Sequence, residues 1–116
     1  GIYVAQNGNV RIGAGTANPT KTLEVNGAIR SKEVLVEVAN WSDFVFDKDY
    51  DLRTLKEVES YIKENGHLPD VPSAEEVKTN GVEVGEMNAI LLQKIEELTL
   101  YIIELEKKID EFDKIK

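Results

Sequence analysis

The sequence predicts an α+β fold made of three unlike segments. Short β-branched stretches separated by Gly, Asn and Pro occupy residues 1–40, two capped helices are expected within residues 41–85, and a heptad repeat runs through residues 86–116. Apolar alternation over a few residues is typical of strands, and apolar spacings of four and three are typical of a helix that packs against other helices. A chain of 116 residues has room for one ordinary domain or a few small modules.

The first segment, residues 1–40, is predicted to consist of strands and turns. The dipeptides Asn7-Gly8 and Asn26-Gly27 supply the positive φ angles of tight turns, and Pro19 marks another corner. The segment has too few large apolar side chains to close a sheet on itself, so we expect neighbouring copies of the chain to complete its core. The predicted strands are Ile2–Ala5, Asn9–Gly13, Thr22–Val25, Ala28–Ser31 and Glu33–Val38.

The middle segment, residues 41–85, is predicted to hold two short helices. Thr54-Leu-Lys-Glu57 and Ser73-Ala-Glu-Glu76 both fit the capping box that opens a helix. The first helix is expected to stop at Asn65-Gly66 and the second at Asn80-Gly81, because Gly and Asn adopt the left-handed conformation that ends helices. The apolar face of the first helix is expected to contain Leu55, Val58, Ile62 and Tyr61.

The last segment, residues 86–116, is predicted to be a coiled-coil helix. Its apolar residues alternate spacings of four and three for more than three heptads, with Ile at position a and Leu at position d. Such a helix is too long to be covered by the rest of so small a chain, so we expect it to pair with copies of itself. The seam, our name for this row of residues, contains Leu91, Ile95, Leu98, Ile102, Leu105, Ile109 and Phe112.

The number of helices in the bundle is not set by the repeat. Ile at a with Leu at d favours two strands. Apolar residues outside the seam, such as Ile90, Leu100 and Ile103, widen the face and favour either a larger bundle or packing of the middle segment on its flank. The heptad pattern therefore leaves dimer and trimer open.

Two stretches of the chain carry a family resemblance. NGNVRIGAGTANPTKTLEVNGAIRSKEV resembles the repeat that ends the shaft of trimeric phage and bacterial fibres, although Arg11 and Ala14 replace the small residues usual there. NWSDFVFDKDYDL, HLPDVPSAEEV and GVEVGEMNAILLQKIEELTLYIIELEKKI resemble the tip region of bacterial tail-fibre-domain proteins and, more distantly, the intramolecular chaperone domain of tail spikes and endosialidases. The resemblance implies a homotrimer whose three chains wrap their short strands into one shaft, registered by a parallel coiled coil.

The same resemblance raises the question of self-cleavage. The chaperone family often cuts itself with a Ser-Lys pair in an S-D-x-R-x-K pattern, and Ser42-Asp43 matches its first two positions. Val45 replaces the Arg and Asp47 replaces the Lys, while Lys48 stands one position late. An acid at the Lys position cannot activate a serine by that route, so we expect no enzymatic activity and no catalytic residue.

Aromatic residues are concentrated near the start of the middle segment, where Trp41, Phe44, Phe46 and Tyr50 lie within ten positions. We interpret them as the small core of this segment. If they are exposed instead, Trp41, Phe44 and Tyr50 are candidates for stacking on the sugar rings of a receptor at a fibre tip.

The composition argues against nucleic acid, a membrane span and a metal ion as partners or features of the chain. The formal net charge of −8 and the lack of a basic stripe argue against nucleic acid as a partner. No apolar run approaches the length of a membrane span, and without cysteine no thiolate metal site is available. Asp47, Asp49 and Asp51 begin like a calcium loop, but Leu52 and Val58 stand where the pattern needs Gly and Glu, so we expect no metal or other cofactor.

These observations lead to one functional hypothesis and two alternatives. We expect the chain to be the structural C-terminal module of a trimeric fibre at a virion or cell surface, driving trimerisation and folding of the shaft. A receptor- or glycan-binding tip and a self-cleaving intramolecular chaperone are the alternatives. In each case the principal partner is the chain itself, as a homotrimer.

Overall fold

The computed structural model describes residues 1–115 and confirms the α+β class. Three strands are followed by three helices, and the chain divides into two compact units, residues 1–35 and residues 36 onward. The division of the chain into segments 1–40, 41–85 and 86–116 stays a prediction.

The first unit is a three-stranded sheet in the order β1-β2-β3, formed by β1 (Ile2–Val4), β2 (Val10–Ile12) and β3 (Leu23–Val25). β1 and β2 form an antiparallel hairpin around Asn7-Gly8, in which Gly8 has a φ of 92°. β3 pairs with β2 in parallel, after a crossover through residues 13–22. The predicted strands at residues 28–31 and 33–38 were wrong, because no described strand lies beyond Val25.

Gly13 and Arg11 hold this crossover in place. Gly13 has a φ of 103°, and a Cβ there would lie 2.8 Å from the carbonyl oxygen of Asn26. Only glycine therefore fits without displacing the backbone at Asn26. Arg11 lies over the ring of Tyr3, with 4.8 Å between the guanidinium carbon and the ring centroid, and donates to the carbonyl of Ala17. Arg11, which departs from the shaft pattern, therefore ties the crossover loop to the sheet.

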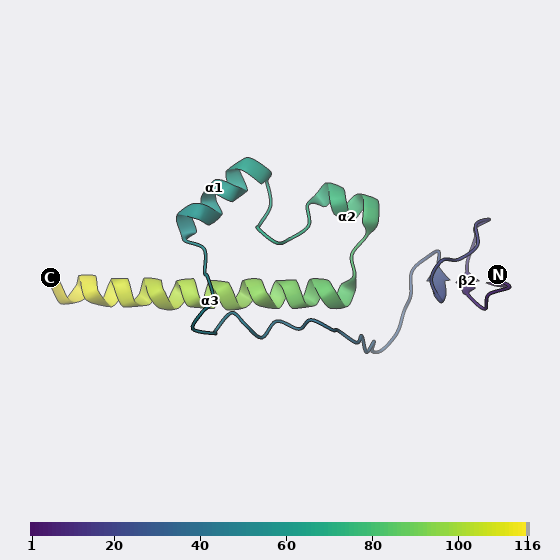
Figure 1. Cartoon of the computed structure of the whole chain (residues 1–116), viewed down its shortest axis with the longest axis horizontal. Coiled ribbons are helices and arrows are strands. Elements are labelled where there is room, and N and C mark those ends of the chain that lie inside the picture. The colour runs from purple at the N-terminus through teal and green to yellow at the C-terminus, as the bar shows by residue number, and fades with distance from the viewer. Residues whose placement is uncertain (116) are drawn as a thin grey trace. The chain divides into compact units, whose positions relative to one another are not determined.

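The second unit is organised along one long helix, α3 (Val84–Ile115), with α1 (Leu55–Asn65) and α2 (Ala74–Asn80) on one side of it in Figure 1. Both predicted capping boxes are confirmed, as are the stops at Gly66 and Gly81. α3 begins two residues before the predicted start of the last segment. Neither α1 nor α2 contains a buried residue, so the two short helices gain little packing within one chain.

An extended segment, residues 36–53, runs along α3 before the chain turns back through α1 and α2 (Figure 1). Its start contacts the first turn of α3, where a Cβ on Gly85 would lie 2.7 Å from Cγ1 of Val36 and 2.8 Å from Cγ2 of Val38. Its end reaches Tyr101, whose hydroxyl donates to the carbonyl oxygen of Arg53 at 2.7 Å. The segment and the helix therefore run in the same direction over about four turns.

Candidate assembly interface

The seam residues of α3 are exposed in the isolated chain. All seven lie in α3, and their exposed fractions range from 45% at Leu91 to 62% at Ile102. Large apolar side chains exposed in a continuous row are unusual on a monomer and mark a surface that contacts another protein. Because α3 starts at Val84, the four-and-three spacing extends backwards to Asn88 and Val84, which are exposed as well.

Surfaces of α3 outside the seam are covered by the rest of the second unit. Gly85 and Ala89, which are buried, face the start of the extended segment and the hollow that contains Ser42 and Phe44. The missing side chain of Gly85 lets Val36 and Val38 lie directly on the helix backbone. One chain thus covers one face of its long helix and leaves the heptad face open.

A cluster of charged and polar side chains joins α3 to the loop between α1 and α2. The buried ammonium of Lys94 contacts Asp70 and Glu97, each at 2.9 Å, and Arg53 contacts the same Asp70 at 3.0 Å. Tyr50 donates to the second oxygen of Glu97 at 2.5 Å. A buried charge is tolerated only when it is paired in this way.

The charges of this cluster change the titration of its members. Hydrogen bonds from Arg53 and then from Lys94 hold the pKa of Asp70 below its ordinary value. Burial by itself would lower the pKa of Lys94, but the hydrogen bonds to Asp70 and Glu97 outweigh it and raise that pKa. Burial, followed by the bond to Glu97, raises the pKa of Tyr50. The charged pairs and the neutral phenol are therefore favoured at neutral pH.

The sheet of the first unit also has an open apolar face. Residues paired across neighbouring strands lie on the same face of a sheet, so the register puts the polar Tyr3, Arg11 and Glu24 together on one face. The six residues that share the other face are all apolar, and Ile2 is 73% exposed. They are Ile2, Val4, Val10, Ile12, Leu23 and Val25.

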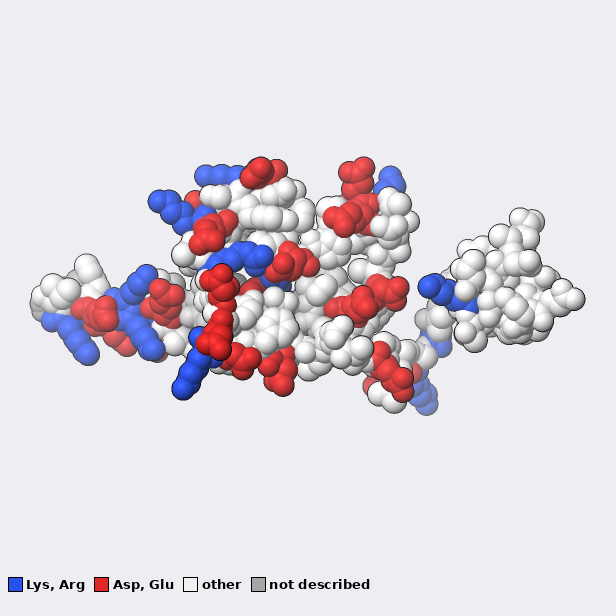
Figure 2. Space-filling view, in the orientation of Figure 1, with Lys and Arg blue, Asp and Glu red and all other residues white. Residues whose placement is uncertain are grey.

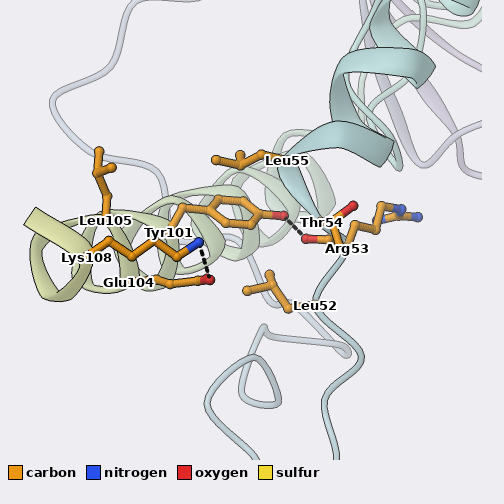
Figure 3. Close-up of a pocket in the computed structure, with 8 residues that line it drawn as sticks. All are labelled: Leu52, Arg53, Thr54, Leu55, Tyr101, Glu104, Leu105 and Lys108. Atoms are coloured by element: carbon orange, nitrogen blue, oxygen red, sulfur yellow. Dashed lines mark hydrogen bonds and ion pairs between the residues drawn. The ribbon is translucent and has the colours of Figure 1, made fainter. Parts of the chain in front are cut away.

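Two hollows line one flank of α3. The first, of about 290 Å³, lies between α3 and the start of α1 and is shown in Figure 3, where Tyr101 points toward the carbonyl of Arg53 and Lys108 toward Glu104. The second, of about 100 Å³, continues under α1 and is bounded by Val58, Leu68 and the seam residue Leu98. The two share Arg53, Leu55 and Tyr101.

The aromatic residues near the start of the second unit do not form the core that we expected from the sequence. Trp41 is 53% and Phe46 60% exposed, whereas Val45 between them is 2% exposed and is the most completely buried large side chain. Phe44 lies against Tyr50 with 5.7 Å between ring centroids. The prediction of an aromatic core was wrong for the isolated chain. The backbone turns here, with the N–H of Asp47 donating to the carbonyl oxygen of Phe44 at 3.1 Å, and the turn buries Val45 and leaves its aromatic neighbours partly exposed.

Ser42 is buried, and its hydroxyl donates to Oε1 of Glu96 at 2.8 Å. Lys48 is exposed. The hydroxyl of Ser42 thus bonds to a carboxylate on α3, which anchors the extended segment. Within residues 1–115, no cluster of three or more His, Asp or Glu is arranged to hold a metal ion.

Neither the polar cluster nor the packing of Gly85 against the extended segment is marked by a local sequence pattern. Lys94 and Glu97 are an ordinary (i, i+3) pair on a charged helix, a pattern that normally indicates a solvated surface. Only the spatial arrangement shows that they are covered. None of the helices in the described chain is both long and apolar enough to cross a membrane.

Comparison with known proteins gave no match to a family model, a curated protein or a solved structure. The geometry of the chain and the resemblance of its two sequence stretches are therefore the grounds for the function proposed below.

Proposed function

We propose that this chain is the structural C-terminal module of a homotrimeric fibre, and that it drives trimerisation and folding of the fibre shaft. The observation that carries the proposal is the seam of α3, a row of large apolar residues of which Leu91 to Ile109 are 45% to 62% exposed within one chain. A parallel coiled coil of α3 helices would bury this row. The proposed location is the surface of a virion or of a bacterial cell.

The apolar face of the sheet supports three-fold assembly of the first unit as well. Strands of three residues cannot form a stable sheet by themselves, and the exposed Ile2 and Leu23 have no core of their own to enter. Three such sheets, each turned with its apolar face inward, would make a closed prism with Tyr3, Arg11 and Glu24 outside. The resemblance of residues 7–34 to a shaft repeat supports the same arrangement.

The charges beside the seam support a parallel arrangement of the helices. In the heptad that places Ile95 at a and Leu98 at d, Lys108 occupies position g and Asp113 position e. Parallel helices bring g of one chain beside e of the next, five residues later, which pairs Lys108 with Asp113 of a neighbour. An antiparallel arrangement places e beside e and g beside g, so it would not bring Lys108 and Asp113 together.

A receptor- or glycan-binding role is a second candidate, favoured by one observation. The rings of Trp41 and Phe46 are more than half exposed, and exposed aromatic rings at a fibre tip stack on sugar rings. The candidate tip contacts remain Trp41, Phe44 and Tyr50. Binding of the isolated trimer to a glycan array, lost in Trp41→Ala, would support this role.

The folding role is tested by comparing two ways of removing residues 86–116. Helices associate quickly, whereas strands shared among chains need slow, non-local pairing, so the helix is needed to start assembly more than to maintain it. Deletion before expression should give unfolded or aggregated residues 1–85, and proteolytic removal after assembly should leave more soluble trimer. Equal yields of trimer from the deleted and full-length chains would refute the folding role.

A further inference from the structure

We propose that the flank of α3 beneath α1 is a docking groove for the α3 helix of a neighbouring copy of this chain, so that each chain's α1 covers its neighbour's helix as well as its own. The inference rests on the proposed trimer and extends it from the seam to the middle segment. The groove is formed by the two hollows between α1 and α3, which meet at Arg53, Leu55 and Tyr101.

The position of the groove on the heptad identifies its occupant. Its helical wall contains Lys94, Tyr101 and Lys108 at position g, with the seam residues Leu98 and Leu105 at position d. In a parallel bundle, the g flank of each helix faces the e flank of the next. The groove therefore opens where a neighbouring α3 would arrive, and it is continuous with the seam through the two leucines.

The apolar surface of α1 is left partly exposed within one chain. The helix contains no buried residue, and its apolar face remains largely uncovered, with Leu55 58% and Ile62 43% exposed. Leu68, in the loop after α1, borders the same groove and is 43% exposed. A second helix lying in the groove would remove this surface from water, which is worth roughly 25 cal/mol per Å² of apolar area.

The opposite flank of α3 has the matching chemistry. Leu92 and Thr99 occupy position e, and the half-exposed Ile103 occupies position b beside them. The hydroxyl of Thr99 donates to the carbonyl oxygen of Ile95 at 2.8 Å, which leaves its methyl group for apolar contact. Further along, the e flank is acidic at Glu106 and Asp113.

One charge of the g flank can reach the acidic e flank of a neighbour. The groove is lined by Glu97 and Glu104 as well as by basic residues, and Lys94 and Arg53 are already paired within the chain. Lys108, which contacts its own Glu104 at 3.3 Å, is 69% exposed and remains accessible to an acid on a second chain. Contact of Lys108 with the acidic e flank of the next chain favours a closed ring of identical chains, each docked on the next.

Chemical cross-linking of the full chain tests the docking, because the native sequence has no cysteine. In the variant Val58→Cys/Ile103→Cys, a short bismaleimide should join one chain's α1 to the next chain's α3 and give covalent trimers on a denaturing gel. Within one chain, Ile103 lies on the side of α3 away from the groove, so a link between chains is expected. The matched control, Val58→Cys/Lys107→Cys, places the second thiol at position f and should give only background.

The outcomes separate this docking from the trimer on which it rests. A double variant that sediments as a trimer but gives no covalent species above the monomer would overturn the docking and leave the proposed function intact. A native chain that sediments as a monomer would overturn both. The pair Leu55→Cys/Thr99→Cys spans the same groove and replaces the first pair if Val58→Cys/Ile103→Cys disturbs assembly.

Discussion

Lys94 and Leu98 lie one turn apart on α3, yet the lysine is 9% exposed and the leucine 56% exposed. Burying a charge while exposing a leucine reverses the usual preference of both residue types. Lys94 is tolerated because Asp70 and Glu97 both pair with it. Leu98 has no comparable reason to face water within one chain, and this contrast supports the proposal that α3 packs against copies of itself.

The first prediction concerns the seam. Leu98→Asp should prevent or severely weaken assembly, because a carboxylate would enter the apolar interior of the bundle at a cost of roughly 2–5 kcal/mol per chain. Strand circular dichroism should fall as well, because the sheet depends on neighbouring chains. Sedimentation and circular dichroism measure the two effects.

The control for this substitution is Lys107→Asp, at an exposed position on the far side of the helix. It should leave both signals unchanged. In a protein that works as a monomer, Leu98→Asp would be nearly neutral because the side chain is already half in water, and that result would contradict the account.

The second prediction concerns the closest approach of the extended segment to α3. Gly85→Ala should lower the free energy of unfolding, because its Cβ would lie 2.7 Å from Val36 and 2.8 Å from Val38. Overpacking costs roughly 1–3 kcal/mol. The better helix propensity of Ala returns at most about 1 kcal/mol. The expected result is a lower midpoint of urea unfolding, measured at constant chain concentration.

Removing the methyl groups of Val36, one of the two clashing side chains, should restore part of this stability. Val36→Ala in the Gly85→Ala background is therefore expected to unfold at a higher urea concentration than Gly85→Ala alone. A Gly85→Ala chain as stable as the native one would show that residues 36–38 do not pack on the helix in solution.

The third prediction concerns acid. The pKa of Asp70 is lowered in the folded chain, so its contribution to stability is present above its ordinary pKa of 3.8 and is lost as the pH falls through the lowered value. Asp70→Asn should therefore be clearly less stable than the native chain at about pH 7, and the difference should shrink at about pH 3. Urea unfolding at both values measures the difference.

A matched variant separates this local effect from the general change in charge on acidification. Asp110→Asn removes an exposed carboxylate on α3, outside the cluster, and should differ little from the native chain at either pH. A stability difference for Asp70→Asn that is the same at both pH values would argue against an ionised Asp70 as the partner of Lys94 and Arg53.

The fourth prediction concerns self-cleavage. A longer expressed chain should stay uncleaved with Ser42 and with Ser42→Ala, so that the two masses differ only by the one oxygen atom of the substitution, because the serine hydroxyl bonds to Glu96 and Lys48 is exposed. Mass spectrometry makes the comparison. A native fragment beginning at or next to Ser42, lost in the variant, would overturn the assignment of a non-enzymatic role.

The parts of the fold that depend on neighbouring residues in sequence were predictable. Both capping boxes and the glycines that end the short helices are local signals, and the heptad repeat locates the long helix. The strands at residues 2–4, 10–12 and 23–25 also follow from β-branched residues between turns. Residues 33–38 have the same composition but no neighbouring strand to pair with, so composition alone gave the wrong answer there.

The seam was predictable because it, too, depends on residues close together in sequence. The polar cluster around Lys94 was not predictable. The seam depends on periodicity within one helix, so the spacing alone identifies its residues. One partner of Lys94 is Asp70, which lies 24 positions away in the sequence. Gly85 is covered by Val36 and Val38, which also lie far from it in the sequence. Such contacts depend on the path of the chain through residues 36–83, which no local pattern determines.

Sedimentation equilibrium of the purified chain at micromolar concentration tests the central claim most directly. In the proposed trimer, partner chains cover the seam of α3 and the apolar face of the sheet, so the measured mass should be three times the 13.0 kDa of one chain. A dimer would contradict the three-fold arrangement, and a stable monomer would contradict assembly itself.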